Sequence, residues 1–141
     1  MAAYAKSMTL AQLKKQLEIW NNTQQETILL RVITLLNTEF AAAETAGLAG
    51  YTVTTGLQNS LEEYLKNFPN DLLRQHLKHL FTLLVTEFGL VETNGLAYTV
   101  TSNLKRHLYD TLACFELTHR MLLHKVLDYF MAEFDLMEAA S

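Results

Sequence analysis

A near-identical internal copy is the feature that most constrains the fold of this chain. Residues 34–54 (TLLNTEFAAAETAGLAGYTVT) align with residues 82–101 (TLLVTEFGLVETNGLAYTVT) once Gly50 is removed, and 15 of the 20 aligned pairs are identical. Self-similarity at a fixed period is typical of repeat architectures, in which each copy is one packing unit. The chain is therefore expected to be built by repetition.

The period continues outside that block. Tyr4, Tyr51 and Tyr98 are spaced 47 residues apart. At 141 residues the chain has the size of one domain. We therefore expect a single domain, residues 1–141, made of three tandem units at 3–49, 50–96 and 97–141.

Each unit predicts two helices that differ in the width of their apolar stripe. The shorter segment has a narrow stripe, at Leu13, Leu17 and Trp20, at Leu57, Leu61, Leu65 and Phe68, and at Leu104, Leu108, Leu112 and Phe115. The longer segment has a broader one, at Leu29, Val32, Ile33, Leu36 and Phe40, at Leu73, Leu77, Leu80, Leu84 and Phe88, and at Leu123, Leu127, Phe130 and Phe134. A helix that is apolar around more of its circumference is buried more deeply. The fold class is therefore all-α, with six helices and the longer ones at the centre.

Residue types near the expected helix ends predict where helices begin. Thr23 and Glu26 have the spacing of a capping box for the first long helix. Pro69, the single proline, suits the first turn of the second long helix. The candidate caps for the short helices that follow each Tyr-Thr-Val-Thr are Thr54 or Thr55, and Thr101 or Ser102.

Residues 89–101 carry a strand-like signal between two expected helices. Asn94-Gly95 is a two-residue turn pair typical of β-hairpins, and Tyr98 and Val100 alternate with threonines after it. This pattern predicts a short hairpin connector. An extended connector without strand pairing is the alternative that the residues leave open.

The order of helix, turn, helix and hairpin over Leu72 to Thr101 resembles a winged-helix unit. It is most similar to the units that precede many S-adenosylmethionine-dependent methyltransferase domains, including those of polyketide synthases. The resemblance covers about a fifth of the chain and implies a helix-plus-wing packing unit. The chain has only five glycines and no glycine-rich cofactor loop, so the resemblance implies no methyl transfer.

The composition suggests that some apolar surface is covered by another chain. Half of the residues are apolar and 18% are charged, whereas an average domain has about 25% charged residues. The last long helix is the least polar segment and has no unit after it. Its expected interaction face, for a protein partner or for a second copy in a homodimer, consists of Leu127, Tyr129, Phe130, Met131 and Phe134. The alternative is that these residues fill the centre of the bundle.

Candidate metal ligands are few. Glu116 and His119 have the Glu-x-x-His spacing of ferritin-like sites, but such sites need two of these elements, and the chain has one. His76 and His79 would share a helix face, beside an apolar stripe. No complete ligand set can be assembled, so we expect no metal.

Catalysis is not expected either. Cys114 near His107 or His119 has the residue types of a nucleophile and base, but a lone helical cysteine is more often a small apolar residue. No phosphate-binding loop or nucleophile-elbow motif occurs. We therefore expect no enzyme activity, no cofactor and no small-molecule substrate.

Nucleic-acid binding is the alternative function, because winged helices often bind DNA. The candidate contacts are Arg74 and Lys78 on the second long helix, with Lys105 and Arg106 after the expected wing. The net charge is −4, and 11 basic residues are spread over three units. Strong binding to phosphates needs several clustered basic contacts, so nucleic acid is not the expected partner.

The expected location is the cytoplasm. The single cysteine fits a reducing compartment, and no apolar run of the length of a signal peptide or membrane span is present. The sequence as a whole predicts a non-catalytic helical-repeat module for protein–protein interaction, as an adaptor or a dimerisation unit.

Overall fold

The computed structural model describes residues 8–141. Over these residues the chain forms six α-helices, one 3-10 turn and no strand. The elements are α1 (Leu10–Glu18), α2 (Thr23–Ala46), α3 (Leu57–Leu65), α4 (Asp71–Asn94), η1 (Gly95–Ala97), α5 (Leu104–Leu112) and α6 (Leu117–Ala140). The short helices have 9 residues each and the long ones 24. The all-α class and the six helices are confirmed.

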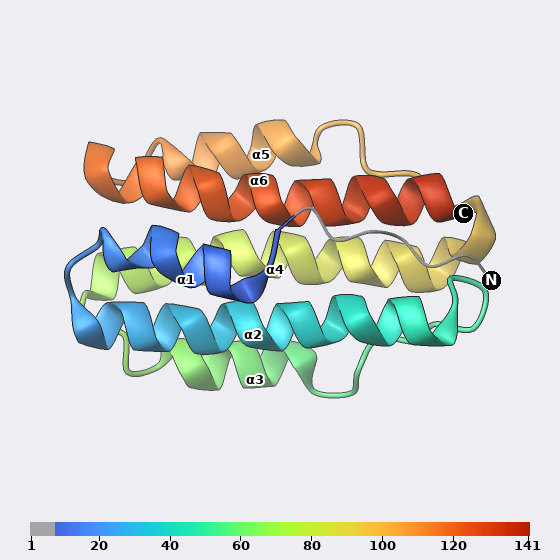
Figure 1. Ribbon diagram of the computed structural model, residues 1–141, viewed down its shortest axis with the longest axis horizontal. Coiled ribbons are helices and arrows are strands. Elements are labelled where there is room, and N and C mark those ends of the chain that lie inside the picture. The colour runs from blue at the N-terminus through green and yellow to red at the C-terminus, as the bar shows by residue number, and fades with distance from the viewer. Residues whose placement is uncertain (1–7) are drawn as a thin grey trace.

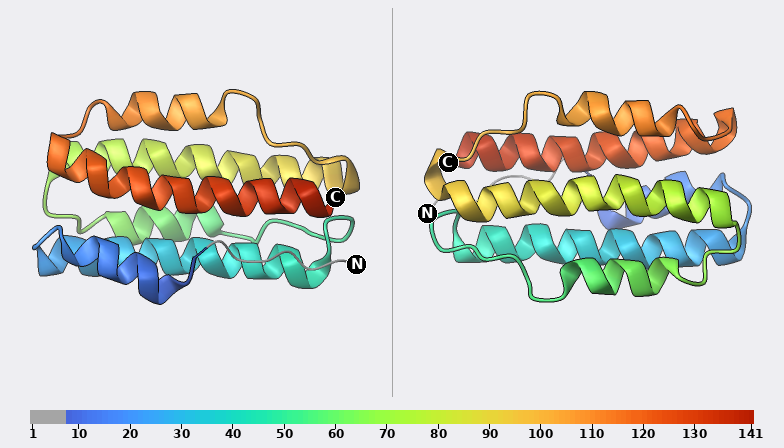
Figure 2. Two further views of the ribbon diagram at one scale, coloured as in Figure 1. Left: turned by 45° about the horizontal axis from the view of Figure 1, so that its top comes forward. Right: turned by 180° about the vertical axis from the view of Figure 1, so that it is seen from behind.

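The long helices α2, α4 and α6 lie side by side at the centre, and the short helices lie outside them (Figures 1 and 2). Helix α1 packs on α2 and α6, α3 packs on α2 and α4, and α5 packs on α4 and α6. Each short helix therefore covers the seam between two long ones. The arrangement is a compact bundle and not an open solenoid.

The seam between α6 and α1 joins the first and the last helix of the described residues. The Lys125 Nζ donates to the Gln16 Oε1 at 2.9 Å. One turn further, the ring centroids of Trp20 and His119 are 4.7 Å apart. This seam closes the circle of helices.

Three phenylalanines meet where the long helices converge. The ring centroids of Phe40 and Phe88 are 4.7 Å apart, those of Phe40 and Phe134 are 4.8 Å apart, and those of Phe88 and Phe134 are 5.0 Å apart. All three side chains are fully buried. Such aromatic contacts add to the free energy gained from burial. They form the axial phenylalanine cluster of the bundle.

The residues of the predicted apolar stripes lie in the hydrophobic core. Every residue assigned to a stripe is buried, and the most exposed of them, Trp20, is only 7% exposed. The narrow stripes of the short helices face the seams beneath them. Periodicity alone therefore located the interior correctly.

The predicted helix starts are wrong by one or two residues. Helix α2 is capped by Asn22, whose side chain accepts from the Gln25 N–H at 3.2 Å, so Thr23 is already helical. Asn70 caps α4 in the same way, which places Pro69 before the cap and not in the first turn. The caps of α3 and α5 are Gly56 and Asn103, and not Thr54 or Thr55 and Thr101 or Ser102. Asparagine is as good a cap as threonine or better, which explains the shift at the long helices.

The predicted hairpin is wrong. Residues 89–94 continue α4, because Leu84, Phe88 and Val91 extend its buried stripe. Gly95 ends the helix with φ at +53° and donates its N–H to the Val91 carbonyl. The Asn-Gly pair thus supplies a helix C-terminus, a position where glycine is equally favoured.

Residues 98–101 form an extended connector without strand pairing. The same holds for residues 51–54, which follow α2. The open alternative is therefore the observed one, and the winged-helix resemblance lacks its wing in the part of the chain that the structure describes.

Candidate interaction surfaces

Each extended connector is held by a buried glutamate from the preceding long helix. Glu87 accepts hydrogen bonds from the Tyr98 hydroxyl at 2.7 Å, the Thr101 N–H at 3.1 Å and the Thr101 hydroxyl at 2.6 Å. Glu39 accepts from the Tyr51 hydroxyl and from the Thr54 N–H, the latter at 3.0 Å. A buried carboxylate with several donors is well satisfied. We call each buried glutamate, together with its hydrogen bonds to the connector that follows, a glutamate clasp. The two clasps fix the connectors in place.

The regular spacing of the three tyrosines therefore has a structural explanation at two of them. Tyr51 and Tyr98 are the clasp donors. Tyr4 lies outside the described residues. The equivalent glutamate of α6, Glu133, is fully buried.

Burial and the neighbouring Glu87 raise the pKa of Tyr98 far above its usual range. Burial, and to a lesser extent the charge of Glu133, raise the pKa of Tyr129 to about 12. In the unfolded chain a tyrosine ionises near pH ~10. Above that pH the unfolded state binds fewer protons than the folded state, so the free energy of unfolding falls as the pH rises.

We therefore expect the protein to lose stability progressively above pH ~10, by up to about 1.4 kcal/mol per pH unit for each such tyrosine. Urea unfolding, followed by circular dichroism at several pH values between neutral and pH ~12, measures the free energy of unfolding at each pH. Tyr98→Phe should be less stable than wild type at neutral pH and should lose stability less steeply in alkali. Tyr64→Phe, at a partly exposed tyrosine, is the matched control. An identical alkaline slope in wild type and Tyr98→Phe would contradict the assignment.

The expected interaction face on α6 lies in the interior. Leu127, Tyr129, Phe130, Met131 and Phe134 are all buried within the single chain. The Tyr129 hydroxyl donates to the Asn37 Oδ1 at 2.5 Å, on α2. These residues are therefore not available as a face on the folded monomer, and the alternative, that they fill the bundle centre, describes the structure.

The four candidate nucleic-acid contacts do not form one patch of free cations. Arg74 pairs with Asp71 at 2.9 Å, and Lys78 pairs with Glu62 at 3.5 Å. The Lys105 Nζ lies 5.5 Å from the centre of the Tyr109 ring. Arg106 is exposed on α5. Three of the four already have a partner within the chain.

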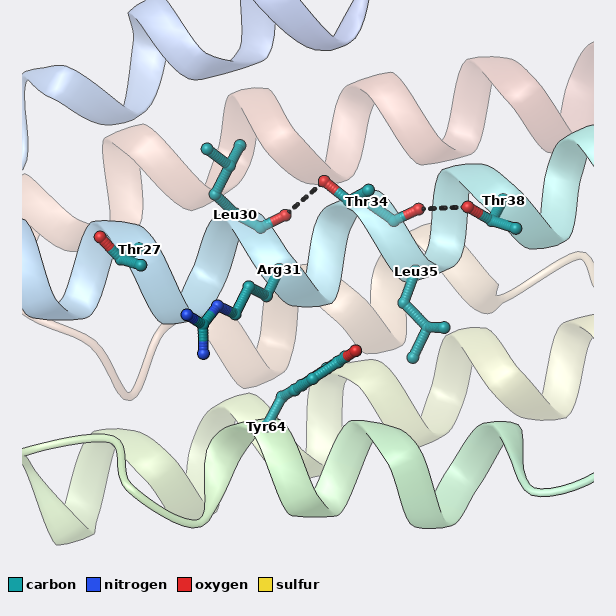
Figure 3. Close-up of a pocket in the computed structure, with 7 residues that line it drawn as sticks. All are labelled: Thr27, Leu30, Arg31, Thr34, Leu35, Thr38 and Tyr64. Atoms are coloured by element: carbon teal, nitrogen blue, oxygen red, sulfur yellow. Dashed lines mark hydrogen bonds between the residues drawn. The ribbon is translucent and has the colours of Figure 1, made fainter.

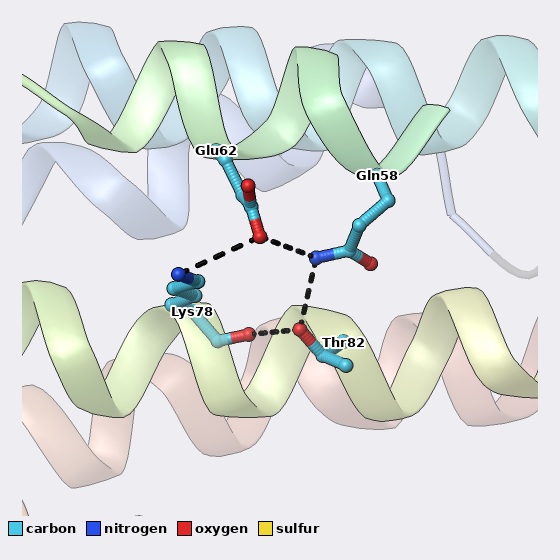
Figure 4. Close-up of polar contacts among 4 residues, drawn as sticks. All are labelled: Gln58, Glu62, Lys78 and Thr82. Atoms are coloured by element: carbon cyan, nitrogen blue, oxygen red, sulfur yellow. Dashed lines mark hydrogen bonds and ion pairs between the residues drawn. The ribbon is translucent and has the colours of Figure 1, made fainter. Parts of the chain in front are cut away.

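The seam between α3 and α4 is bridged by polar side chains (Figure 4). Gln58 donates through its Nε2 to the Glu62 Oε1 at 3.3 Å and to the Thr82 hydroxyl at 3.1 Å. With the Lys78 ion pair to Glu62, this network occupies the charges on that side of α3. A charged ligand that bound to Lys78 there would compete with Glu62.

The candidate metal and nucleophile residues are scattered. His119 lies against Trp20, and His76 lies 5.4 Å from Phe115, ring centre to ring centre. Cys114 is exposed. The residues that the structure describes contain no group of three or more His, Cys, Asp or Glu side chains placed to hold a metal ion. The absence of metal binding and of catalysis remains a prediction.

A groove on the other side of α3, which we call the α2/α3 groove, was not predicted (Figure 3). It encloses about 380 Å³ and is lined by Thr27, Leu30, Arg31, Thr34, Leu35, Thr38 and Tyr64. A second hollow of about 640 Å³ adjoins it and shares Thr27, Arg31 and Tyr64. The two leucines are the signal that sequence reasoning passed over, since they lie outside the buried stripe of α2 and are only partly buried.

Comparison of the chain with protein-family models, with curated proteins and with solved structures finds no significant match.

None of the helices within residues 8–141 contains a stretch long and apolar enough to cross a membrane.

Proposed function

We propose that this chain is a non-catalytic helical module that binds another protein through the α2/α3 groove. The observation that carries the proposal is the groove itself. It combines partly buried leucines with Tyr64, which is 38% exposed, and with the exposed Arg31. Tyrosine and arginine are the residue types most enriched, with tryptophan, where binding energy concentrates in protein interfaces.

We also propose that the three helix pairs are tandem repeats of one unit. The equal helix lengths, the axial phenylalanine cluster and the two glutamate clasps support this. Each feature recurs at the position that the sequence period assigns to it. The α4 side of α3 also has a hollow, of about 670 Å³, but its lining is mostly charged or polar and polar contacts bridge the two helices there.

The test is to isolate a partner with the tagged chain, purify both proteins and measure their binding by calorimetry with wild type and Tyr64→Ala. Tyr64→Ala should weaken binding by tenfold or more, as expected for an aromatic anchor worth at least about 1.4 kcal/mol. Leu96→Ala, at an exposed leucine of η1, is the control and should bind as wild type does. A chain that has no partner, and that stays monomeric at high micromolar concentration by sedimentation, would contradict the proposed function.

A further inference from the structure

We propose that the α2/α3 groove binds an amphipathic α-helix of a partner protein, and that this helix brings a carboxylate to Arg31. This inference rests on the proposed function and specifies the partner.

Arg31 supplies the charge. Its side chain leaves α2 on the side of α3, with the guanidinium to the left of the Tyr64 ring in Figure 3, and it forms no ion pair with any residue in the described part of the chain. Glu63 lines the adjoining hollow but is not within ion-pair distance. On the α4 side of α3, by contrast, Arg74 and Lys78 are both paired. A guanidinium beside an apolar groove complements a carboxylate, which it binds in a planar, two-pronged geometry.

The walls of the groove suit a helix better than a strand. Thr34 donates its hydroxyl to the Leu30 carbonyl at 2.8 Å, and Thr38 donates its hydroxyl to the Thr34 carbonyl at 3.0 Å. These hydroxyl protons are therefore used within α2. An extended peptide needs partners for its own backbone N–H and C=O groups, whereas a helix satisfies them internally.

The length of the groove also matches a helix. The two adjoining hollows follow α2 from Thr23 to Thr38. That span is about 22 Å at a rise of 1.5 Å per residue, or about four helical turns. An amphipathic helix of this length presents anchors at i, i+3, i+4 and i+7 to such a groove. A small ligand would occupy only a part of it.

The probe is a displayed library of synthetic helical peptides of about 16 residues, with a fixed leucine stripe and random residues elsewhere. After selection on the wild-type protein, we expect glutamate or aspartate to be enriched at one position beside the leucines. Arg31→Glu should weaken binding of a selected peptide by about tenfold or more, measured by fluorescence anisotropy. Replacing the enriched acid by lysine should restore binding to Arg31→Glu and weaken binding to wild type.

Arg106→Glu is the matched control, because it makes the same change of charge at an exposed position on α5. It should bind the peptide as wild type does. Arg31→Gln serves as a milder second variant, and circular dichroism checks that each variant is folded.

Three results would overturn the inference: no enrichment of an acid, equal effects of Arg31→Glu and Arg106→Glu, or binding that survives Tyr64→Ala unchanged. A wild type that self-associates, and loses this on Tyr64→Ala, would assign the groove to a second copy instead. A purified protein partner that is insensitive to Arg31→Glu would overturn this inference alone, whereas the absence of any partner would overturn the proposed function.

Discussion

Met131→Asp is expected to unfold the chain at neutral pH. Met131 is 8% exposed and lies in the interior of the bundle on α6. An aspartate there places a carboxylate in an apolar site without a partner, which costs several kcal/mol. A domain of this size has only about 5–15 kcal/mol of stability in total. Far-UV circular dichroism and a thermal melt should show loss of the cooperative transition.

Met121 offers a control on the same helix with the same substitution. It is 59% exposed, so Met121→Asp should change the free energy of unfolding by no more than about 0.5 kcal/mol. A Met131→Asp variant that melts like wild type but no longer self-associates would mean that Met131 lies in an interface between two chains. That result would contradict the burial of Met131 within one chain.

Phe40→Ala is expected to lower the free energy of unfolding by about 3–5 kcal/mol. Its ring contacts Phe88 and Phe134 in the axial cluster and also stacks on Phe130, with centroids 5.8 Å apart. Removing the ring leaves a cavity where all three long helices meet, and the helices cannot collapse into it without shifting together. Urea unfolding at equilibrium measures the loss.

The matched control is Leu72→Ala, at a helical residue that is 62% exposed. It should change the free energy of unfolding by no more than about 0.5 kcal/mol. Phe40→Leu should fall between the two, because it keeps part of the apolar volume. Equal losses for Phe40→Ala and Leu72→Ala would mean that the axial cluster does not hold the bundle together.

The six helices could be predicted because their apolar residues recur at helical spacing over several turns. This periodicity results from burying one face of each helix, so it can be recognised even when single residues depart from the pattern. Helix ends depend on one or two side chains and were less predictable. Thr23 and Asn22 both have the chemistry of a cap, and only the backbone conformation decides between them.

Asn94-Gly95 shows why the hairpin prediction was wrong. Glycine adopts positive φ both in a tight β-turn and after the last turn of a helix, so the pair alone does not distinguish the two. The buried Phe88 and Val91, four and seven residues after Leu84, decided in favour of the helix. The longer-range pattern outweighed the local turn signal.

The candidate surface was harder to predict than the fold. The apolar surplus of α6 predicts an interaction face, but α6 packs among two other long helices and two short ones and buries 10 of its 24 residues within the chain. The α2/α3 groove depends on how α3 lies along α2, which no residue pattern in either helix specifies. Tertiary packing, and not composition, determines which apolar residues remain accessible.

The seam between α1 and α6 has a consequence for the order in which the chain folds. The five other pairs of helices whose backbones lie closest are neighbours along the chain, so their contacts close short loops. The side chains of α2, α4 and α6 meet across the centre in addition. The contact of Gln16 with Lys125 spans 109 residues. Closing a free loop of that length costs about 4 kcal/mol of chain entropy, beyond a constant term.

That cost falls sharply once the neighbouring helices have docked, because the remaining loop is then a short, nearly rigid path. The cheapest route therefore forms the contacts between neighbouring helices first and docks α1 on α6 last. Trp20, the single tryptophan, lies in this final seam against His119. The Trp20 ring also lies 6.2 Å from the Phe68 ring, centre to centre, so its fluorescence reports packing at this end of the bundle, separately from the helix content that circular dichroism follows.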